Sequence, residues 1–463
     1  MSVLVDVLKA VFWGCLLLSA LVFIHEGGHY LSARAFGMRV TEFFLGMPCK
    51  WRLSHKSKSH GTEVGVTPIL LGGYNRICGM DELPGEHAAN VLACVSRHGR
   101  IKIDDVAAEL GISRVDVLAE MQVLYDWASL EPYYDEEFDE HSDQKNWPEC
   151  MQTVERDANL LTAFDSGHDF TREGSTKAGE PHAIPGTPQE FLESEASRTY
   201  CGKGSFARIV TLVAGPAVNL VFGLALLIGC FSIGGIQTLV NLPVIGSVEQ
   251  GSLAEACGMK AGDTITSVGG LEVSTWEDMG DALQSSIAGG EPFEVAFTRD
   301  DQSHQVEVDP ADEPDGSGLF GINASVATYH PSFGQSAEIS WRYFTYTLSY
   351  IGKLFVPSTT AEVVSQSSSV VGISVMASQA ASTGATDFLF LMAGISLSLG
   401  LMNLIPIPPL DGGKLLIELV QLVSRRRVPM KVQNGLSYVG LALALLLFVV
   451  VLRQDIMRFV LGG

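Results

Sequence analysis

Apolar residues are gathered into four long runs, and these runs set the expected architecture. The first extends from about Ala10 into the segment Phe23–Tyr30 (FIHEGGHY), and no charged side chain occurs from Ala10 to Ile24. The other three lie within residues 209–236, 388–410 and 432–452. Each is close to the roughly 20 residues that a membrane-spanning helix needs. The pattern therefore predicts a polytopic α-helical membrane protein with about four transmembrane helices.

A cleaved signal peptide is the alternative explanation of the first run. Asp6 and Lys9 leave the residues before it without net charge, and cleavage would remove or expose the HEGGH sequence. Both points favour a span that is retained in the mature chain.

Basic residues predict which side of the membrane each loop faces. Lys and Arg are concentrated in residues 34–58, after the first span, and in residues 425–431, between the third and fourth spans. Both loops fall on the same side of a four-span chain, and the positive-inside rule makes that side cytoplasmic. We therefore expect a multi-pass protein of the cell (inner) membrane, with residues 82–200 in the cytoplasm and the segment between spans two and three outside it.

Charge is distributed unevenly along the chain. Of the net charge of −22, residues 81–198 contribute −17, because they hold 26 acidic and 9 basic side chains. Nucleic-acid-binding surfaces need basic contacts, so this composition argues against nucleic acid as a partner. The 8 cysteines include no CxxC pair, so we expect neither a disulfide framework nor a Cys-based zinc site.

The segment His25-Glu-Gly-Gly-His29 places ionisable groups at membrane depth, where such groups are costly and usually functional. His25 and His29 stand one helical turn apart on the same face and can share one zinc, while Glu26 can act as base toward a metal-bound water. Gly27 and Gly28 each cost about 1 kcal/mol inside a helix, so we expect them to admit another backbone or a substrate. The competing interpretation is a pair of histidines that binds no metal.

A catalytic zinc normally has three protein ligands and a water. Asp411 is the candidate for the third ligand, in the segment Asn403–Gly413 (NLIPIPPLDGG) that ends the third span. Its prolines break the helix, and irregular backbone at membrane depth is tolerated only inside protein or beside a wet cavity. The alternative is that Asp411 simply caps the span.

The two segments together, HEGGH and NLIPIPPLDGG, resemble the site-2 protease family of intramembrane zinc metalloproteases. They are most similar to the bacterial branch that cuts anti-sigma factors in envelope stress signalling. Leu71–Tyr74 (LGGY) is similar to the family's membrane-associated β-hairpin, and Ala214–Asn219 (AGPAVN) to its second-span motif. One segment departs from the family pattern, because Ser369–Ile373 (SVVGI) stands where the family usually has GPVGI.

The resemblance implies a set of site residues. Zn²⁺ would be the cofactor, held by His25, His29 and Asp411, and Glu26 would be the general base. Asn403 and Asn219 would bind the substrate near the scissile peptide.

Two soluble modules are expected between the spans. Residues 241–325 resemble a PDZ domain, which either adds an extended peptide to a sheet edge or only filters substrates by size. Residues 82–133 resemble a winged helix. Its would-be recognition helix offers Arg114 against Asp116 and Glu120, so we expect a protein-docking or regulatory insert, with a structural insert as the alternative. Residues 134–200 are acidic and carry little apolar surface, so we expect them to be disordered.

The chain is thus expected to contain eight segments. They are the first span with HExxH and the membrane-associated hairpin (1–81), the cytoplasmic winged-helix-like insert (82–133), the acidic linker (134–200), the second span (201–240), the PDZ-like α/β domain (241–325), an amphipathic or linker region (326–384), the third span with the LDG motif (385–424), and a basic loop with the fourth span (425–463).

The expected function is that of a zinc metalloendopeptidase. Its substrate would be a transmembrane protein already trimmed outside the membrane, such as an anti-sigma-factor-like protein or a signal-peptide remnant. Its other partners would be the lipid bilayer and a cytoplasmic protein that binds the insert. The alternative is a non-catalytic membrane scaffold, but such a protein would be expected to have lost His25, Glu26, His29 or Asp411, and all four are present.

Overall fold

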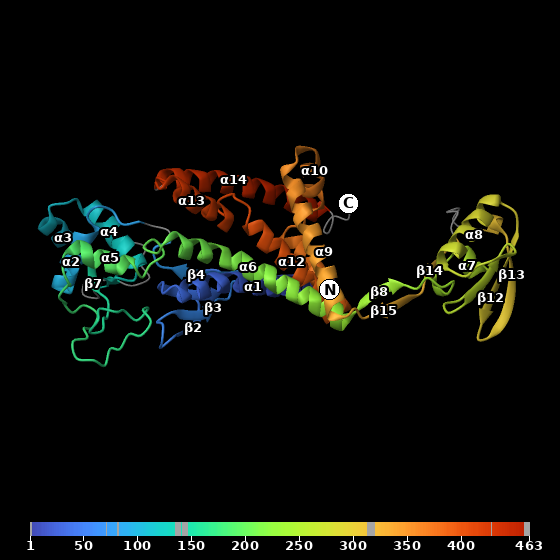
Figure 1. Ribbon diagram of the computed structural model, residues 1–463, viewed down its shortest axis with the longest axis horizontal. Coiled ribbons are helices and arrows are strands. Elements are labelled where there is room, and N and C mark those ends of the chain that lie inside the picture. Colours follow the sequence, from blue (N-terminus) through green and yellow to red (C-terminus); the bar gives the residue numbers. More distant parts are fainter. Residues whose placement is uncertain are drawn as a thin grey trace. The chain divides into compact units, whose positions relative to one another are not determined.

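The computed structural model describes residues 2–70, 72–80, 83–134, 140, 147–312, 320–426 and 428–457. The chain forms two compact units (Figure 1), one made of residues 1–227 and 340–463 and the other of residues 228–339. Each unit is described by itself.

Four helices in the described part of the chain are long and apolar enough to cross a membrane, as the hydrophobic pattern predicts. They are α1 (Ser2–Ala35), α6 (Ser205–Gly229), α12 (Ala385–Asn403) and α14 (Met430–Asp455). Helix α12 ends at Asn403, before the expected limit at residue 410, because the prolines that follow cannot donate backbone hydrogen bonds to a helix. Asp411 then begins a separate helix, α13 (Asp411–Ser424).

The expected single hairpin after α1 is a four-stranded sheet. Its strands are β1 (Val40–Leu45), β2 (Leu53–Lys56), β3 (Glu63–Val66) and β4 (Gly73–Ile77), in the order β2-β3-β1-β4. Strand β1 runs parallel to β3 and antiparallel to β4. The sheet is therefore larger than the expected hairpin, and the buried Val40, Phe43 and Phe44 of β1 attach it to the protein core.

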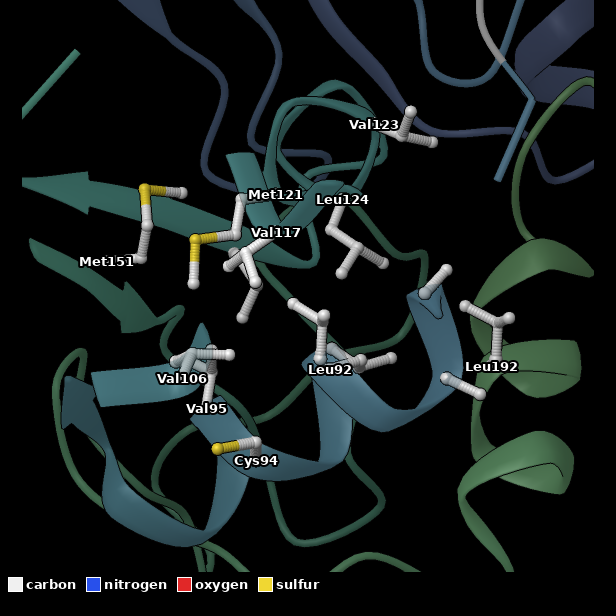
Figure 2. Close-up of a cluster of buried hydrophobic side chains, with 14 of the residues drawn as sticks. Leu92, Cys94, Val95, Val106, Val117, Met121, Val123, Leu124, Met151 and Leu192 are labelled. Carbon is white, nitrogen blue, oxygen red and sulfur yellow. The ribbon is translucent and has the colours of Figure 1, made fainter. Parts of the chain in front are cut away.

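Residues 83–133 form a compact module with its own core. Its elements are α2 (Ala88–His98), β5 (Arg100–Lys102), α3 (Ile103–Leu110), α4 (Arg114–Asp126) and β6 (Leu130–Tyr133). Figure 2 shows Leu92 and Val95 of α2 facing Val117 and Leu124 of α4 in a cluster of buried apolar side chains. The helical spacing of apolar residues read from the sequence is therefore the spacing that builds this core.

The expectation that residues 134–200 are disordered is wrong for residues 147–200. These residues form β7 (Cys150–Thr153), which pairs with both β5 and β6, and α5 (Pro188–Ala196), which adds Phe191 and Leu192 to the module's core. The acidic run at 135–146 lies outside the described residues except Glu140. Residues 83–134 and 147–200, which we call the insert, thus form one folded body.

Buried charges explain why an acidic segment folds here. Arg39, four residues after α1, is fully buried and donates to Asp165 Oδ2 at 2.7 Å and to Glu195 Oε2 at 2.8 Å. Glu195 is also fully buried and accepts from Arg156 Nη1 at 3.0 Å and from Ser129 Oγ at 2.6 Å. Acidic side chains that composition counts as solvated are therefore paired inside the insert and tie it to the end of α1.

The remaining helices of the larger unit occupy the region expected to be amphipathic or linker. They include α10 (Pro357–Gln366) and α11 (Val370–Thr383), and α9 (Phe333–Gly352) begins in the smaller unit. Ser369, the first residue of the segment that departs from the family pattern, caps α11 by accepting a hydrogen bond from the Val371 backbone at 3.2 Å.

The smaller unit is an α/β module built around one sheet. Strands β10 (Thr264–Val268), β11 (Leu271–Glu272), β12 (Phe293–Arg299) and β13 (Gln302–Val308) pair in the order β11-β10-β12-β13. Two short ladders join β9 (Ile245–Val248) to β14 (Ile322–Ala324) and β8 (Ile236–Leu239) to β15 (Val326–Tyr329), and α7 (Leu253–Ala256) and α8 (Trp276–Gly289) complete the unit. The segment expected to be an α/β domain is therefore folded as one.

Candidate metal centre

The candidate metal centre begins with two histidines on one face of α1. His25 and His29 are both buried, and their Nε2 atoms lie 3.2 Å apart. The HExxH spacing places them one turn apart, as the sequence predicts.

Helix α6 supplies the wall behind His29. Two glycines allow the approach: a Cβ on Gly28 would collide with the Ala214 backbone, and a Cβ on Gly215 would collide with the His29 ring. The Nδ1–H of His29 donates to the Thr211 carbonyl at 2.7 Å. The expectation that a glycine of HEGGH admits another backbone is confirmed for Gly28. Gly27 instead faces the ring of Phe43 at ordinary contact distance.

Asp411 is brought to the histidines by the turn between α12 and α13. Its Oδ2 atom lies 2.9 Å from His25 Nε2 and 3.2 Å from His29 Nε2. A Cβ on Gly412 or Gly413 would collide with the backbone of residues 404–408, so this turn can close only with small residues after Asp411. The structure therefore brings together the three ligands that the sequence nominates from two distant segments.

The three ligand atoms fit a divalent cation. Because the Nδ1 atom of His29 carries the proton given to Thr211, its Nε2 atom presents a lone pair toward His25 and Asp411. Two imidazole nitrogens and a carboxylate oxygen converging in this way repel one another unless a proton or a metal ion lies between them. Zinc binds this donor set, with the outer ring nitrogen typically held by a backbone carbonyl.

Asn219 of α6 lies against the His25 ring. It is fully buried, its Nδ2 atom is 3.4 Å from His25 Nδ1, and its Oδ1 atom has no hydrogen-bond partner in the described structure. Rotating the amide by half a turn would place Oδ1 opposite an Nδ1–H of His25. That arrangement satisfies both groups and leaves His25 Nε2 as a lone pair for a metal.

Glu26 lies on a different side of α1 from the two histidines. Its carboxylate is held by Asn75 of β4, whose Nδ2 atom donates to Glu26 Oε2 at 2.6 Å and to the Glu26 carbonyl at 3.1 Å. The sequence analysis did not single out Asn75, although a polar residue directly after LGGY was a visible signal. It also missed Thr211, which accepts the His29 hydrogen bond through its backbone carbonyl. Every residue type has this carbonyl, so the identity of the side chain gives no signal.

Asn403 is not joined to this group by any hydrogen bond within the described residues. It is the last residue of α12 and is half-buried. Its expected contact with substrate stays a prediction.

A second group of ligand-type side chains lies in the insert, where Cys94, His98 and Glu109 have atoms within 4.8 Å of one another. Arg97 already pairs with Glu109 at 2.8 Å, and burial together with Glu109 raises the pKa of the Cys94 thiol to about 11. Metals bind the thiolate, so these residues are better explained as a hydrogen-bonded cluster than as a metal site.

Comparison with known proteins identifies the family of the chain. The model of peptidase family M50 matches residues 13–447 of the chain. The zinc metalloprotease RasP of Geobacillus kaustophilus is 25% identical to the chain and is aligned over 98% of it and 100% of the relative. The RasP of Oceanobacillus iheyensis is 26% identical, with 96% of this chain and 97% of the relative covered. The match spans the HEGGH helix, the sheet, both soluble modules and the Asp411 turn, so this multi-pass membrane protein belongs to peptidase family M50.

Proposed function

We propose that the protein is an intramembrane zinc metalloendopeptidase. It hydrolyses a peptide bond within a transmembrane segment of a membrane protein that has already been trimmed outside the membrane. The convergence of His25, His29 and Asp411 beside Glu26 carries the proposal, because the two histidines and the base belong to a helix long and apolar enough to span a bilayer. A non-catalytic membrane scaffold would not require these four side chains to lie together.

The residues have separate roles in the proposed reaction. His25 Nε2, His29 Nε2 and Asp411 Oδ2 would hold the zinc, whose Lewis acidity activates water and polarises the scissile carbonyl. Glu26 takes a proton from the attacking water as the water oxygen bonds to the carbonyl carbon. It then gives that proton to the peptide nitrogen as the C–N bond breaks, so one carboxylate serves as base and then as acid.

The soluble modules suggest how substrates are chosen. We place the smaller unit outside the membrane, as a PDZ-like domain that excludes substrates with bulky outer parts. The insert would face the cytoplasm and bind a protein there. Nucleic acid is a poor candidate because Arg114 at the start of α4 is already paired with Asp104 at 2.7 Å and Glu149 at 2.8 Å.

The test replaces Glu26 by Gln, which keeps the size of the side chain but cannot accept the proton. Purified Glu26→Gln protein should retain its zinc and lose cleavage of a membrane-helix substrate in liposomes. The matched control is Glu362→Gln, on the exposed side of α10, which should cleave like the wild type. Turnover of Glu26→Gln within tenfold of the wild type would refute the role of Glu26, and a wild type that cleaves no membrane helix would favour the scaffold.

A further inference from the structure

The side-chain amide nitrogen of Asn75 donates two hydrogen bonds to Glu26. The Nδ2 atom lies 2.6 Å from Glu26 Oε2 and 3.1 Å from the Glu26 backbone carbonyl. One N–H therefore fixes a carboxylate oxygen, and the other fixes the same residue's backbone. A single side chain thus sets the angle at which the carboxylate leaves α1.

The position of Asn75 is itself fixed by the packing of the sheet on α1. Asn75 of β4 is the cross-strand partner of Phe43 of β1. The Phe43 ring stacks on Phe23 and Tyr30, with ring centroids 4.6 Å and 4.9 Å apart. Cross-strand partners share one face of a sheet, so the aromatic contact and the amide contact reach α1 together.

Gly27 lies on α1 beneath the docked sheet. Phe23, Gly27 and Tyr30 follow one another at i, i+4 and i+7, so they form a single stripe along α1. Phe43 occupies the space above Gly27, where a Cβ would stand 3.9 Å from the end of its ring. The first glycine of the motif, Gly27, therefore faces the sheet, whereas the second, Gly28, faces α6.

The hydrogen bond also distinguishes the two oxygens of Glu26. An amide N–H can only donate, so the oxygen that it contacts must keep an accepting lone pair throughout the reaction. Oε2 uses one of its two lone pairs in this way and becomes the less basic oxygen, so the proton from water goes preferentially to Oε1, which then passes it to the peptide nitrogen.

From this geometry we infer that Asn75 is a positioning residue for hydrolysis, which holds Glu26 by Oε2 so that Oε1 is the oxygen that carries the transferred proton. The inference rests on the proposed function, because it assigns the role of Asn75 through the general base. Residues that orient catalytic groups in this way typically contribute about 10- to 100-fold to activity.

The experiment compares four full-length proteins in detergent: wild type, Asn75→Leu, Asn75→Gln and the control Arg76→Gln. Arg76 is the next residue of β4 and points to Tyr125 and Asp126 instead of α1. Asn75→Leu should lower kcat about 10- to 100-fold, with KM and zinc content unchanged. Asn75→Gln keeps the donors and should recover much of the loss, and Arg76→Gln should remain within about twofold of the wild type.

Affinity for a peptide hydroxamate gives a measurement that does not depend on turnover. A hydroxamate chelates zinc and donates its hydroxyl proton to the base. In protein that keeps Glu26, the Asn75→Leu substitution should therefore weaken hydroxamate binding about tenfold. The same substitution made in Glu26→Gln protein should weaken binding little further, because the two residues act as one unit.

Two results would overturn the inference. One is an Asn75→Leu protein with wild-type kcat and wild-type hydroxamate affinity. The other is an equal loss of affinity with and without Glu26, which would show a general structural role. A wild type that binds the hydroxamate but cleaves no membrane helix would instead overturn the proposed function. The comparison of hydroxamate affinities with and without the Glu26→Gln substitution would still decide the role of Asn75.

Discussion

Replacing Arg39 by Met should destabilise the insert and weaken its attachment to the end of α1. Met has a similar length and can occupy the buried site, but it removes the guanidinium shared by Asp165 and Glu195. Both carboxylates are buried, and Glu195 keeps Arg156 whereas Asp165 loses its ion-pair partner at 2.7 Å. Removing one partner of a buried ion pair typically costs about 3–5 kcal/mol, because the other charge is left uncompensated.

Hydrogen exchange measured peptide by peptide would detect this loss. A decrease of about 3–5 kcal/mol in the free energy of opening speeds exchange by about 10²- to 10⁴-fold. The effect should appear in the amides of β7 and α5, which close around the network. Arg114→Met is the matched control, because its pairs with Asp104 and Glu149 are exposed and should contribute about 0.5 kcal/mol or less.

The pH dependence follows from the carboxylates. Burial alone would raise the pKa values of Glu195 and Asp165, but the neighbouring arginines hold both below their usual range. Such groups add stability above the unfolded pKa of about 4, and this stability is lost as pH falls through the lower folded values. Without Arg39, Asp165 can relieve its buried charge by taking up a proton, so the deficit should be smaller at pH 4.5 than at pH 7.5. Equal exchange in Arg39→Met and Arg114→Met at neutral pH would refute the reasoning.

Two further predictions concern the metal centre. Asp411→Asn should lower zinc content well below one ion per chain, by about 10-fold or more in affinity, because it removes the only anionic ligand; undiminished zinc by elemental analysis would exclude Asp411. Gly215→Ala should displace the His29 ring and reduce both zinc content and cleavage, whereas Gly229→Ala, where a Cβ meets open space on the same helix, should change neither.

The sequence carries more information on the candidate metal ligands than on the surroundings of Glu26. HExxH places both histidines by helical spacing alone, and the Pro- and Gly-rich turn marks Asp411, so each ligand carries a local signal. The contact between Asn75 and Glu26 depends on the docking of a sheet on a helix, which no local pattern reports. Such a contact can be found only when the register of β4 against β1 is known.

The acidic segment 134–200 shows a second way in which prediction from sequence fails. Composition treats Glu195 and Asp165 as solvated charges, and on that basis residues 134–200 have too little apolar surface to fold. The structure pairs them with Arg39 and Arg156, which lie 156 and 39 residues from Glu195 in the chain. Net charge therefore overestimates disorder wherever opposite charges meet after folding.

The arrangement of α1 also determines how the insert can act on catalysis. Arg39 precedes β1 directly, and β1 carries Phe43, which is the cross-strand partner of Asn75 and stacks on Phe23 of α1. A partner that shifts the insert therefore acts on the strand that supports the base. The proposed zinc ligands are held instead by α1, α6 and the turn before Asp411. We expect a protein bound to the insert to change the rate of hydrolysis much more than the affinity for zinc.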